Sequence, residues 1–344
     1  MGSSDRVINM EPIPQHRVAV VAPFTQFLAS VGAPFERGFR KVGLPVCALE
    51  DENNFIPSHR FWMFLVEMSF NQDIPDLGFR VGQKYGANCV DSHLTDLLFQ
   101  SPTLYQGIVK SSALINKTVS NCQVGLLQPS NSQYSYFFHQ PSCSANNPAI
   151  EQIGWYGIFP FIGIARMFLG AEWLPEEIGV MVNHPPSSFV SEQFPDTYIR
   201  LAQPYCYIAL KNTQLSLPPL SHQSIATRYP ASPHAALSTD FVGSIKKLVR
   251  SYISEENLNL ELVAEICEMS QRSLQRRLAE SSTHFTELLD YARFDLSKQM
   301  LQDANNNITD ISQVLRYSDA THFARAFRRI AGISPHLYRQ QFLN

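Results

Sequence analysis

The stretch TDISQVLRYSDATHFARAFRRIAGISP, residues 309–335, predicts two short helices joined by a tight turn. Thr309 is a good N-cap for a first helix over residues 310–315, and the next residues form the turn. Asp319 then caps a longer helix over residues 320–331. Two helices held together by so short a turn form a helix-turn-helix unit.

The second helix of this unit has one apolar side and one basic side. Phe323 and Phe327, four positions apart, face the core, and Gly332 ends the helix with Pro335 just beyond it. The other side suits a DNA duplex, because arginine can bind guanine through two hydrogen bonds and a neighbouring arginine can reach phosphate. We expect base contacts from Ala320, Thr321, His322 and Arg325, and backbone contacts from Arg328 and Arg329. In the turn, Arg316 either adds a phosphate contact or is a solvated turn residue.

The same pattern occurs 49 positions earlier in the chain. The recurring pairs are Leu262/Ile311, Ile266/Leu315, Ser270/Asp319, Leu274/Phe323, Arg276/Arg325 and Leu278/Phe327. Asn259 caps a helix that runs to about Cys267, and Ser270 caps a second helix over residues 271–280. The side chains of this copy that suit a major groove or a phosphate are Gln271, Arg272, Gln275, Arg276 and Arg277. Two such units, at about 259–280 and 309–331, predict an all-α DNA-binding domain.

Between the two units, residues 283–301 carry apolar side chains at helical spacing. We expect a linker helix that fixes the distance between the units. From Ile311 to the C-terminus there are five arginines and one acidic residue, Asp319, although the whole chain has a net charge of -3. The second unit is therefore a local basic patch on a weakly acidic protein.

The C-terminal third resembles the DNA-binding domain of the AraC/XylS family of bacterial transcription regulators. The matching positions of the second unit are Ile311, Tyr317, Asp319, Phe323, Arg325, Phe327, Gly332, Ser334, Pro335, Tyr338 and Arg339. One departure is Arg316, where many members have a glycine in the turn. The resemblance covers about residues 239–339 and implies that the second helix of each unit enters one of two successive major grooves. It also implies an activator that contacts RNA polymerase at a promoter, with repression left open.

The DNA-binding region accounts for only about a hundred residues, and a chain of 344 residues with 44% hydrophobic residues can bury two cores. Four prolines at positions 218, 219, 230 and 233 mark a linker between them. We predict an N-terminal domain over residues 1–220 for effector sensing or dimerisation. A linker at 221–237 and the DNA-binding domain at 238–344 follow it.

The N-terminal region divides into a helical part and a part with strands. Residues 24–116 show helical periodicity. We expect strands at 123–128, 134–139, 178–183 and 205–210, and a helix at about 149–169. The fold class predicted for this part is an α+β sensor domain.

This region also resembles, more loosely, the N-terminal domain of the AraC-family branch that includes the ornithine utilisation regulators. The matching positions are residues 78–82, residues 101–104, Arg166, Gly170, Trp173, Pro175, His184 and residues 217–220. Most of them are apolar or turn residues, so the resemblance implies a shared fold. Many relatives carry a polar asparagine near the last strand, where this chain has Tyr205 and Cys206, so ornithine is not carried over as the effector.

Aromatic residues concentrate between positions 134 and 161. One interpretation is a cavity for a small-molecule effector, and the other is a plain aromatic core. The effector-binding candidates are Tyr136, Phe138, Trp155, Phe159 and His184. His139 and His184 would hold a carboxylate or be satisfied histidines, and the second interpretation is favoured.

Other function classes are excluded by the residues that they need. The sequence has no G-x-S-x-G elbow, H-E-x-x-H helix, P-loop or G-x-G-x-x-G run, which argues against an enzyme. None of its cysteines lies in the P-C-H-R setting of DNA-repair methyltransferases, and no two lie close enough in sequence for a zinc site. We expect neither metal nor cofactor. The polar start and the lack of a long apolar run predict a cytoplasmic protein without a membrane segment.

Two functions remain open at this stage. The first is a transcription regulator controlled by a small molecule or partner at its N-terminal domain. The second is a ligand-independent DNA-binding regulator in which this domain serves only dimerisation or partner binding. Both include a possible homodimer, and both need the double helix-turn-helix.

Overall fold

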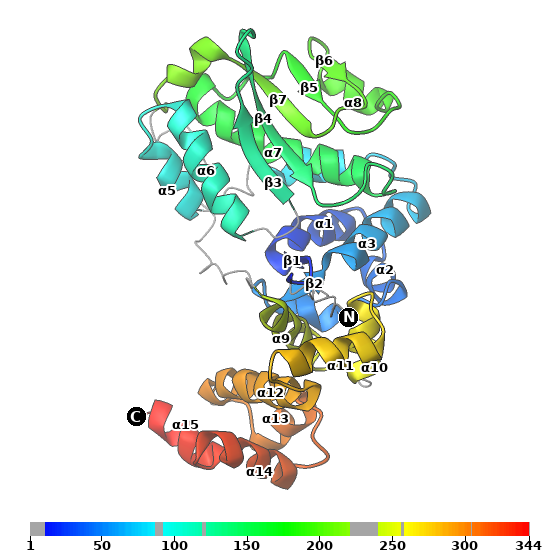
Figure 1. The fold of residues 1–344 in the computed structure, drawn as a ribbon, viewed down its shortest axis with the longest axis vertical. Helices are drawn as coiled ribbons and strands as arrows, with labels where there is room; N and C mark the ends of the chain where they lie inside the picture. The colour runs from blue at the N-terminus through cyan, green and yellow to red at the C-terminus, as the bar shows by residue number, and fades with distance from the viewer. Residues whose placement is uncertain are drawn as a thin grey trace, which may run out of the picture. The chain divides into compact units, whose positions relative to one another are not determined.

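The computed structural model describes residues 11–86, 92–118, 122–220, 240–255, 258–303 and 305–343, which fall into two compact units. The helical unit consists of Met1–Val18, Leu44–Pro57 and Ser238–Asn344, and the sheet unit of Ala19–Gly43 and Ser58–Leu237. Figure 1 shows their elements in chain order. The predicted fold class, an α+β region before an all-α DNA-binding domain, is confirmed. The sequence placed all of residues 1–220 in one domain, whereas the structure groups two short segments of this range with the C-terminal residues.

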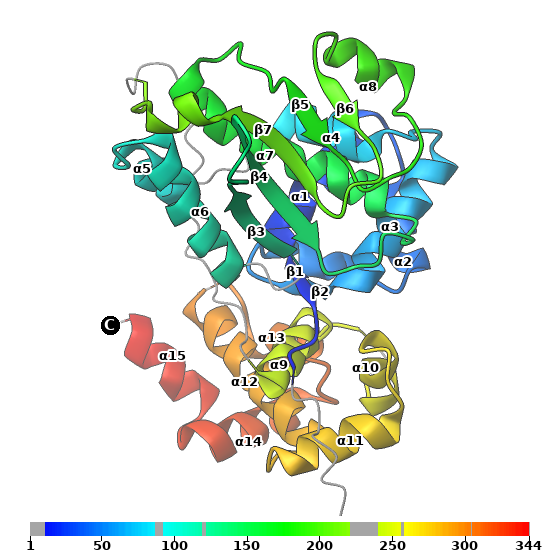
Figure 2. The same cartoon turned by 45° about the horizontal axis from the view of Figure 1, so that its top comes forward.

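The sheet unit is built on five strands in the order β3-β4-β7-β5-β6 (Figure 2). The strands are β3 (Cys122–Leu127), β4 (Tyr134–Pro141), β5 (Glu177–Gly179), β6 (Tyr198–Arg200) and β7 (Cys206–Lys211). All neighbouring pairs are antiparallel except β5 and β6. Three predicted strands lie within about one or two residues of β3, β4 and β7. The strand predicted at 178–183 is shorter, and β6 was not predicted.

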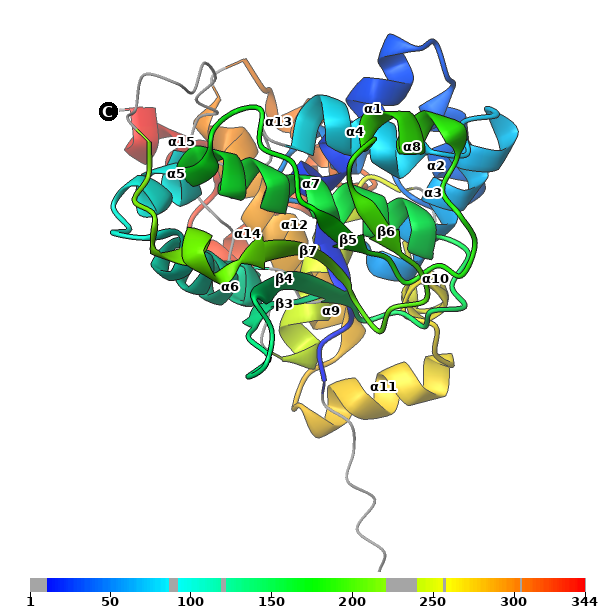
Figure 3. The same ribbon diagram turned by 90° about the horizontal axis from the view of Figure 1, so that it is seen from above.

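Helix α7 (Ile150–Leu169) packs against β4 and β7, and α4 (Leu77–Tyr85) packs against α7 (Figure 3). The two helices approach closely because glycines face the contact. A Cβ at Gly78 would lie 2.0 Å from the carbonyl oxygen of Gln152, and one at Gly82 would lie 2.3 Å from the ring of Phe159. The Gln152 side chain accepts a hydrogen bond from the Gly78 N–H at 2.7 Å. The glycines at 78 and 82 are therefore needed for helix packing.

The remaining helices of the sheet unit surround this layer. They are α1 (Val18–Ser30), α2 (Phe35–Lys41), α3 (Ser58–Asn71), α5 (Ser92–Phe99), α6 (Leu104–Thr118) and α8 (Ser188–Gln193), with a 3-10 turn η3 (Asn212–Ser216) after β7. Helix α6 packs on β3. The main buried cluster lies where α7 meets the sheet, with Phe137 of β4 stacked on Phe161 of α7 at 3.8 Å between ring centroids.

The helical unit has seven helices among its described residues, with α12 between the pairs α10/α11 and α13/α14 (Figure 1). They are α9 (Phe241–Ser251), α10 (Leu260–Ile266), α11 (Gln271–Glu280), α12 (Phe285–Gln302), α13 (Ile308–Val314), α14 (Ala320–Ala331) and α15 (Pro335–Leu343). One buried cluster runs through the unit, from Phe241 and Leu248 to Leu274, Leu288 and Phe327. The predicted connector is confirmed as α12, which buries Leu288, Ala292 and Leu301.

Two segments from the first 57 residues complete the helical unit. β1 (Gln15–Arg17) and β2 (Phe55–Pro57) pair antiparallel, and a 3-10 turn, η1 (Val46–Glu50), precedes β2. They are held to α9 by side chains of that helix. Ser244 Oγ accepts from the Ile13 N–H at 3.0 Å, and Ser251 Oγ accepts from the Phe55 N–H at 3.0 Å. Gln15 Nε2 donates to the Ser244 carbonyl oxygen at 2.7 Å.

Candidate nucleic-acid interface

The first helix-turn-helix unit begins and ends where its capping residues predict. The Asn259 side chain accepts a hydrogen bond from the Leu262 N–H at 2.9 Å, which caps α10. Ser270 accepts from the Ser273 N–H at 3.1 Å, which caps α11. Both caps satisfy backbone donors that the first turn of a helix leaves without partners.

The second unit differs from the prediction at its first helix. The N-cap of α13 is Asn307, whose side chain accepts from the Asp310 N–H at 2.8 Å, so the prediction of Thr309 as the cap is wrong. Asparagine is at least as good an N-cap as threonine, and α13 starts two residues earlier than predicted. In α14 the predicted cap is confirmed, because Asp319 accepts from the His322 N–H at 2.7 Å. This bond is the main reason that the pKa of Asp319 lies below its usual value.

The two units are therefore not related by one constant offset. The caps of α10 and α13, Asn259 and Asn307, are 48 positions apart, whereas the caps of α11 and α14, Ser270 and Asp319, are 49 apart. The buried residues that correspond to Ile311 and Leu315 are thus Val263 and Cys267, and the predicted pairings with Leu262 and Ile266 are wrong. The turn of the second unit is one residue longer.

Each turn passes through a left-handed backbone conformation at a residue that is not glycine. Glu268 has φ 53° and Arg316 has φ 56°. After each, a backbone N–H returns to the preceding helix, from Met269 to the Ala264 oxygen and from Tyr317 to the Ser312 oxygen, both at 2.9 Å. The turn at Arg316 therefore keeps the geometry that a glycine would adopt, at a cost of about 1 kcal/mol.

The second helices present one exposed polar face each. On α11, Leu274 and Leu278 are buried, whereas Gln271, Arg272, Gln275 and Arg276 are exposed. On α14, Phe323 and Phe327 are buried, whereas Thr321, His322, Arg325 and Arg328 are exposed and Ala320 is half-buried. The exposed positions follow the spacing that places side chains on one side of a helix. The nine residues predicted at these positions thus lie where a nucleic acid would reach them.

Three predicted contact residues are engaged within the helical unit itself. The guanidinium of Arg277 lies 3.8 Å from the ring centroid of Phe241, and its Nη2 donates to the Glu11 carbonyl oxygen at 3.3 Å. Burial lowers the pKa of Arg277. Arg316 Nε donates to the Ser254 carbonyl oxygen at 2.9 Å, and Arg329 forms an ion pair with Asp290 of α12. These arginines contact other parts of the helical unit. For Arg316 the bond to Ser254 is a third role, beside the phosphate contact and the solvated turn residue expected from the sequence.

The connector α12 is fixed along its C-terminal half. Arg250 of α9 binds Asp295 at 2.8 Å and Gln299 at 2.8 Å, and also lies 3.4 Å from Asp51. At the C-terminal end of α12, Arg339 of α15 donates from Nε to the Leu301 carbonyl oxygen at 3.3 Å and from Nη2 to the Asn306 carbonyl oxygen. These bonds fix the C-terminal half of α12 against α9 and α15.

Comparisons with known proteins agree with this geometry. Residues 263–341 match a family model described as a helix-turn-helix domain. The C-terminal region forms an AraC-type DNA-binding domain. The regulator VqsM from Pseudomonas aeruginosa is 27% identical over 136 residues, which are 39% of this chain and 42% of that protein. The uncharacterized regulator Rv1395 from Mycobacterium tuberculosis is 34% identical over 79 residues, which are 23% of either chain.

A third relative of the AraC-type domain is the transcriptional activator NphR from a Rhodococcus species, 24% identical over 103 residues, with 30% of this chain and 31% of NphR covered. The matched segments span less than half of each of these relatives. Among solved structures, the regulator CdpR from Pseudomonas aeruginosa aligns over 94% of this chain and 98% of its own, with a TM-score of 0.41 and 16% identity.

The residues predicted to bind an effector do not line one cavity. Along β4 the side chains alternate, so that Phe137 and His139 face α7, whereas Tyr136 and Phe138 lie on the opposite face of the sheet. There Tyr136 packs on Tyr207 and Phe138 on Tyr205, with ring centroids 4.7 and 5.0 Å apart.

The other predicted effector residues lie elsewhere in the sheet unit. Trp155 is 2% exposed and packs on Phe79 of α4, as does Phe159. His184 is exposed, 3.8 Å from Glu151. The prediction of a shared aromatic pocket is therefore wrong, because the strand separates its members. The alternative, a plain aromatic core, describes Trp155.

His139 is a buried histidine of the sheet unit. Its Nε2 lies 3.3 Å from the Gly154 carbonyl oxygen, and burial lowers its pKa to about 4. The ring is therefore neutral at pH 7, as a satisfied core residue would be. Within the described residues, no group of three histidine, cysteine, aspartate or glutamate side chains lies close enough for a metal ion, and no helix is long and apolar enough to span a membrane.

Proposed function

We propose that the protein is a sequence-specific DNA-binding transcription regulator. The observation that carries this proposal is the pair of capped helices, α11 and α14, whose apolar sides share one core and whose other sides are exposed and basic. Each would insert into one of two successive major grooves, about 34 to 36 Å apart, as helix-turn-helix proteins do. Helix α12 sets this spacing.

Each exposed residue is assigned a role from its chemistry. Arg276 and Arg325 would read guanine through two hydrogen bonds, and Gln271 and Gln275 would read adenine. Thr321, His322 and Ala320 lie at the start of α14, where recognition helices contact bases. Arg272 and Arg328 would bind phosphate. Arg277, Arg316 and Arg329 are left out of this set because they hold the helical unit together.

We further infer that the protein activates transcription through RNA polymerase at a promoter, inside the bacterial cytoplasm. The relatives NphR and CsvR are each named as transcriptional activators, which supports this direction of control. A repressor would bind the same duplexes. The two differ in a reporter assay, where an activator raises expression from the bound promoter and a repressor lowers it.

The sheet unit is the proposed site of control. It has its own core and is joined to the helical unit by chain connections at residues 18–19, 43–44, 57–58 and 237–238. The linker expected at 221–237 lies outside the described residues. A ligand that binds it would shift the DNA-competent population only by its difference in affinity for two states. A domain that served only a homodimer would instead make DNA binding depend on protein concentration.

Selection of duplexes from a random pool by the full-length protein tests the proposal. A selected duplex should bind 10³ to 10⁷ times more tightly than a shuffled one, roughly the range of specific regulators. The double variant Arg276→Ala and Arg325→Ala should lower this preference by roughly 2 to 6 kcal/mol, whereas Arg37→Ala, an exposed arginine of the sheet unit, should keep it. Equal binding to selected and shuffled duplexes by the unmodified protein would refute sequence-specific recognition.

A further inference from the structure

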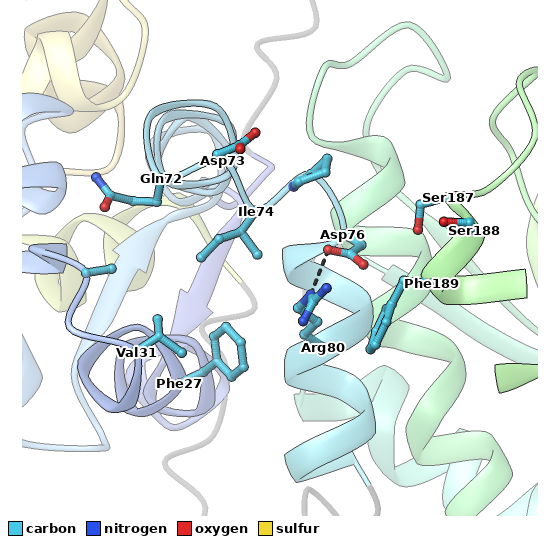
Figure 4. Close-up of a pocket in the computed structure, with 12 residues that line it drawn as sticks. Phe27, Val31, Gln72, Asp73, Ile74, Asp76, Arg80, Ser187, Ser188 and Phe189 are labelled. Carbon is cyan, nitrogen blue, oxygen red and sulfur yellow. Dashed lines mark hydrogen bonds and ion pairs between the residues drawn. The ribbon is translucent and has the colours of Figure 1, made fainter. Parts of the chain in front are cut away.

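The sheet unit has a pocket of about 500 Å³ between α1, the loop after α3, and the start of α4 and α8 (Figure 4). Its volume is within the range of small-molecule sites, roughly 300 to 1,000 Å³. None of the residues expected from the sequence to bind an effector lines it.

The two walls of this pocket differ in character. One wall is apolar and carries Phe27, Val31 and Ile74 (Figure 4). The other carries Asp76, Arg80 and Phe189, with the Arg80 guanidinium 4.0 Å from the centroid of the Phe189 ring. A molecule that fills the space would meet hydrocarbon on one side and a cation on the other.

Only the Nε edge of the Arg80 guanidinium is hydrogen-bonded to another described residue. Its Nε donates to Asp76 Oδ1 at 2.8 Å, and Asp76 is buried. Within the residues that the structure describes, the two terminal nitrogens of Arg80 have no protein hydrogen-bond partner, and its side chain is 38% exposed. The ion pair and the ring contact thus fix the planar group while its outer edge faces the pocket (Figure 4).

A fixed guanidinium edge matches a carboxylate, because two parallel N–H groups can donate to its two oxygens. The facing apolar wall would cover a short hydrocarbon or aromatic tail. Asp76 offsets the charge of Arg80, and Asp73 adds a negative charge to the lining, so a carboxylate would be held by the two hydrogen bonds of the guanidinium edge and not by net charge. A multiply charged anion is disfavoured for the same reason. The combination favours a ligand with one carboxylate and an apolar body.

We propose that this pocket binds a small monocarboxylic acid with an apolar tail, and that this acid is the effector that controls DNA binding. The regulatory part of this inference rests on the proposed function, because an effector needs a DNA-binding activity to control. The binding of the acid to the pocket does not depend on the proposed function. Arg80 is the specificity-determining residue, and Phe27, Val31 and Ile74 select the tail.

The test measures the melting temperature of the full-length protein with butanoate, hexanoate, octanoate and phenylacetate, each beside its uncharged amide. A ligand that binds only the native state must raise the melting temperature. At least one acid should raise it in proportion to the logarithm of concentration, and the matched amide should not. Absence of a shift with every acid, or equal shifts with acid and amide, would overturn the proposal.

Variants at the two walls identify the site. Arg80→Lys keeps the charge beside Asp76 but loses the planar edge, and should weaken acid binding about tenfold to a hundredfold. Val31→Trp should block the pocket, since Val31 is 52% exposed and lines the apolar wall. The matched controls are Arg37→Lys on α2 and Val109→Trp on α6, both exposed and outside the pocket. Equal acid binding by Arg80→Lys, Val31→Trp and these controls would place the acid elsewhere.

The same samples separate this proposal from the proposed function. Duplex binding is measured by fluorescence anisotropy with and without the acid, on the selected duplex described above. We expect the acid to change the affinity of the unmodified protein and to leave that of Arg80→Lys unchanged. Acid binding without any effect on the DNA affinity would overturn the regulatory part alone. Failure of the unmodified protein to bind any duplex would overturn the proposed function and leave the acid site standing.

Discussion

Arg276 and Arg325 occupy equivalent places on α11 and α14, and both are exposed. Arg276 has only a weak internal partner, Glu280, at 3.8 Å. We expect Arg276→Ala and Arg325→Ala each to cost roughly 1 to 3 kcal/mol on the cognate duplex, because each removes a pair of hydrogen bonds to one base. The loss should be much smaller on a shuffled duplex. Binding isotherms on both duplexes measure the difference.

Arg328→Ala is the matched control for these variants. It lies on the exposed side of α14, one turn beyond Arg325, where a phosphate is the expected partner. It should weaken binding to both duplexes alike and reduce the slope of affinity against salt concentration by about one unit. If Arg276→Ala and Arg325→Ala behaved in the same way as Arg328→Ala, their assignment to bases would be wrong.

Arg316 has two effects on the stability of its turn that oppose each other. Its left-handed backbone costs about 1 kcal/mol, and its hydrogen bond to the Ser254 carbonyl oxygen returns about the same amount. We therefore expect Arg316→Gly to change the free energy of unfolding by less than about 1 kcal/mol and to leave the salt dependence of DNA binding unchanged. Arg316→Lys, which keeps the charge, is the control. A fall in the salt slope with glycine but not with lysine would restore the phosphate contact.

His139 makes the sheet unit sensitive to acid. In the unfolded chain a histidine binds a proton at about pH 6.5, whereas in the fold its pKa is about 4. The contribution of His139 to the free energy of unfolding is therefore fully present above about pH 6.5. It decreases as the pH falls toward 4, by at most roughly 3 kcal/mol. In urea denaturation between pH 7 and 4.5, His139→Gln should lose less stability than the unmodified protein. His284→Gln, at an exposed position, should follow the unmodified protein, and an unchanged slope in His139→Gln would contradict this account.

The end of α14 depends on a glycine for its backbone and not for space. Gly332 has φ 77°, its N–H donates to the Arg328 carbonyl oxygen at 2.9 Å, and a Cβ there would meet nothing within 4 Å. Gly332→Ala should therefore destabilise the protein by about 1 kcal/mol from backbone strain alone. Gly332→Asn should cost less, because asparagine tolerates this conformation better. Denaturant midpoints of the three proteins give the comparison, and an equal cost for both variants would argue against strain as the cause.

Helices with local signals at both ends are the elements that the sequence predicts best. The bounds of α11 and α14 agree with prediction because Ser270, Asp319 and Gly332 act within one turn of themselves. The start of α13 was missed because Asn307 and Thr309 are both acceptable caps, although Asp310 three positions after Asn307 is an available signal. The sequence does not reveal which side chains of β4 face the core, because aromatic side chains lie on both faces of this strand.

Contacts between distant parts of the chain were beyond prediction. The pairing of β1 with β2 joins residues about 40 positions apart, and their attachment to α9 joins residues about 200 positions apart, through short strands without a repeating pattern. The pocket beside Arg80 likewise draws on α1, α4 and α8. The sequence identified the run around Arg80 only as a mark of the fold. Local rules therefore located the DNA-binding face, and the arrangement of the chain was needed to locate the pocket.

A fragment of residues 240–344 tests how far the AraC-type domain stands alone. Its main core lies within these residues, so it should fold and protect two successive major grooves. It lacks residues 11–18 and 44–57, and with them three hydrogen bonds to α9 that contribute about 1 kcal/mol each. We expect its melting temperature to be lower than that of the helical unit in the full chain.

The substitution Ser251→Ala tests whether the fragment is less stable because it lacks the bond from β2 to α9 or because truncation destabilises it in general. In the full chain the substitution leaves the Phe55 N–H without its acceptor and should cost about 1 to 2 kcal/mol, whereas in the fragment this partner is absent and the cost should be close to zero. Ser334→Ala, at the start of α15, removes only the local bond that Ser334 Oγ accepts from the Leu337 N–H at 3.3 Å and should cost the same in the two proteins. The comparison is made by denaturation of all six proteins. An equal cost of Ser251→Ala in fragment and full chain would mean that β2 does not stabilise α9 in solution.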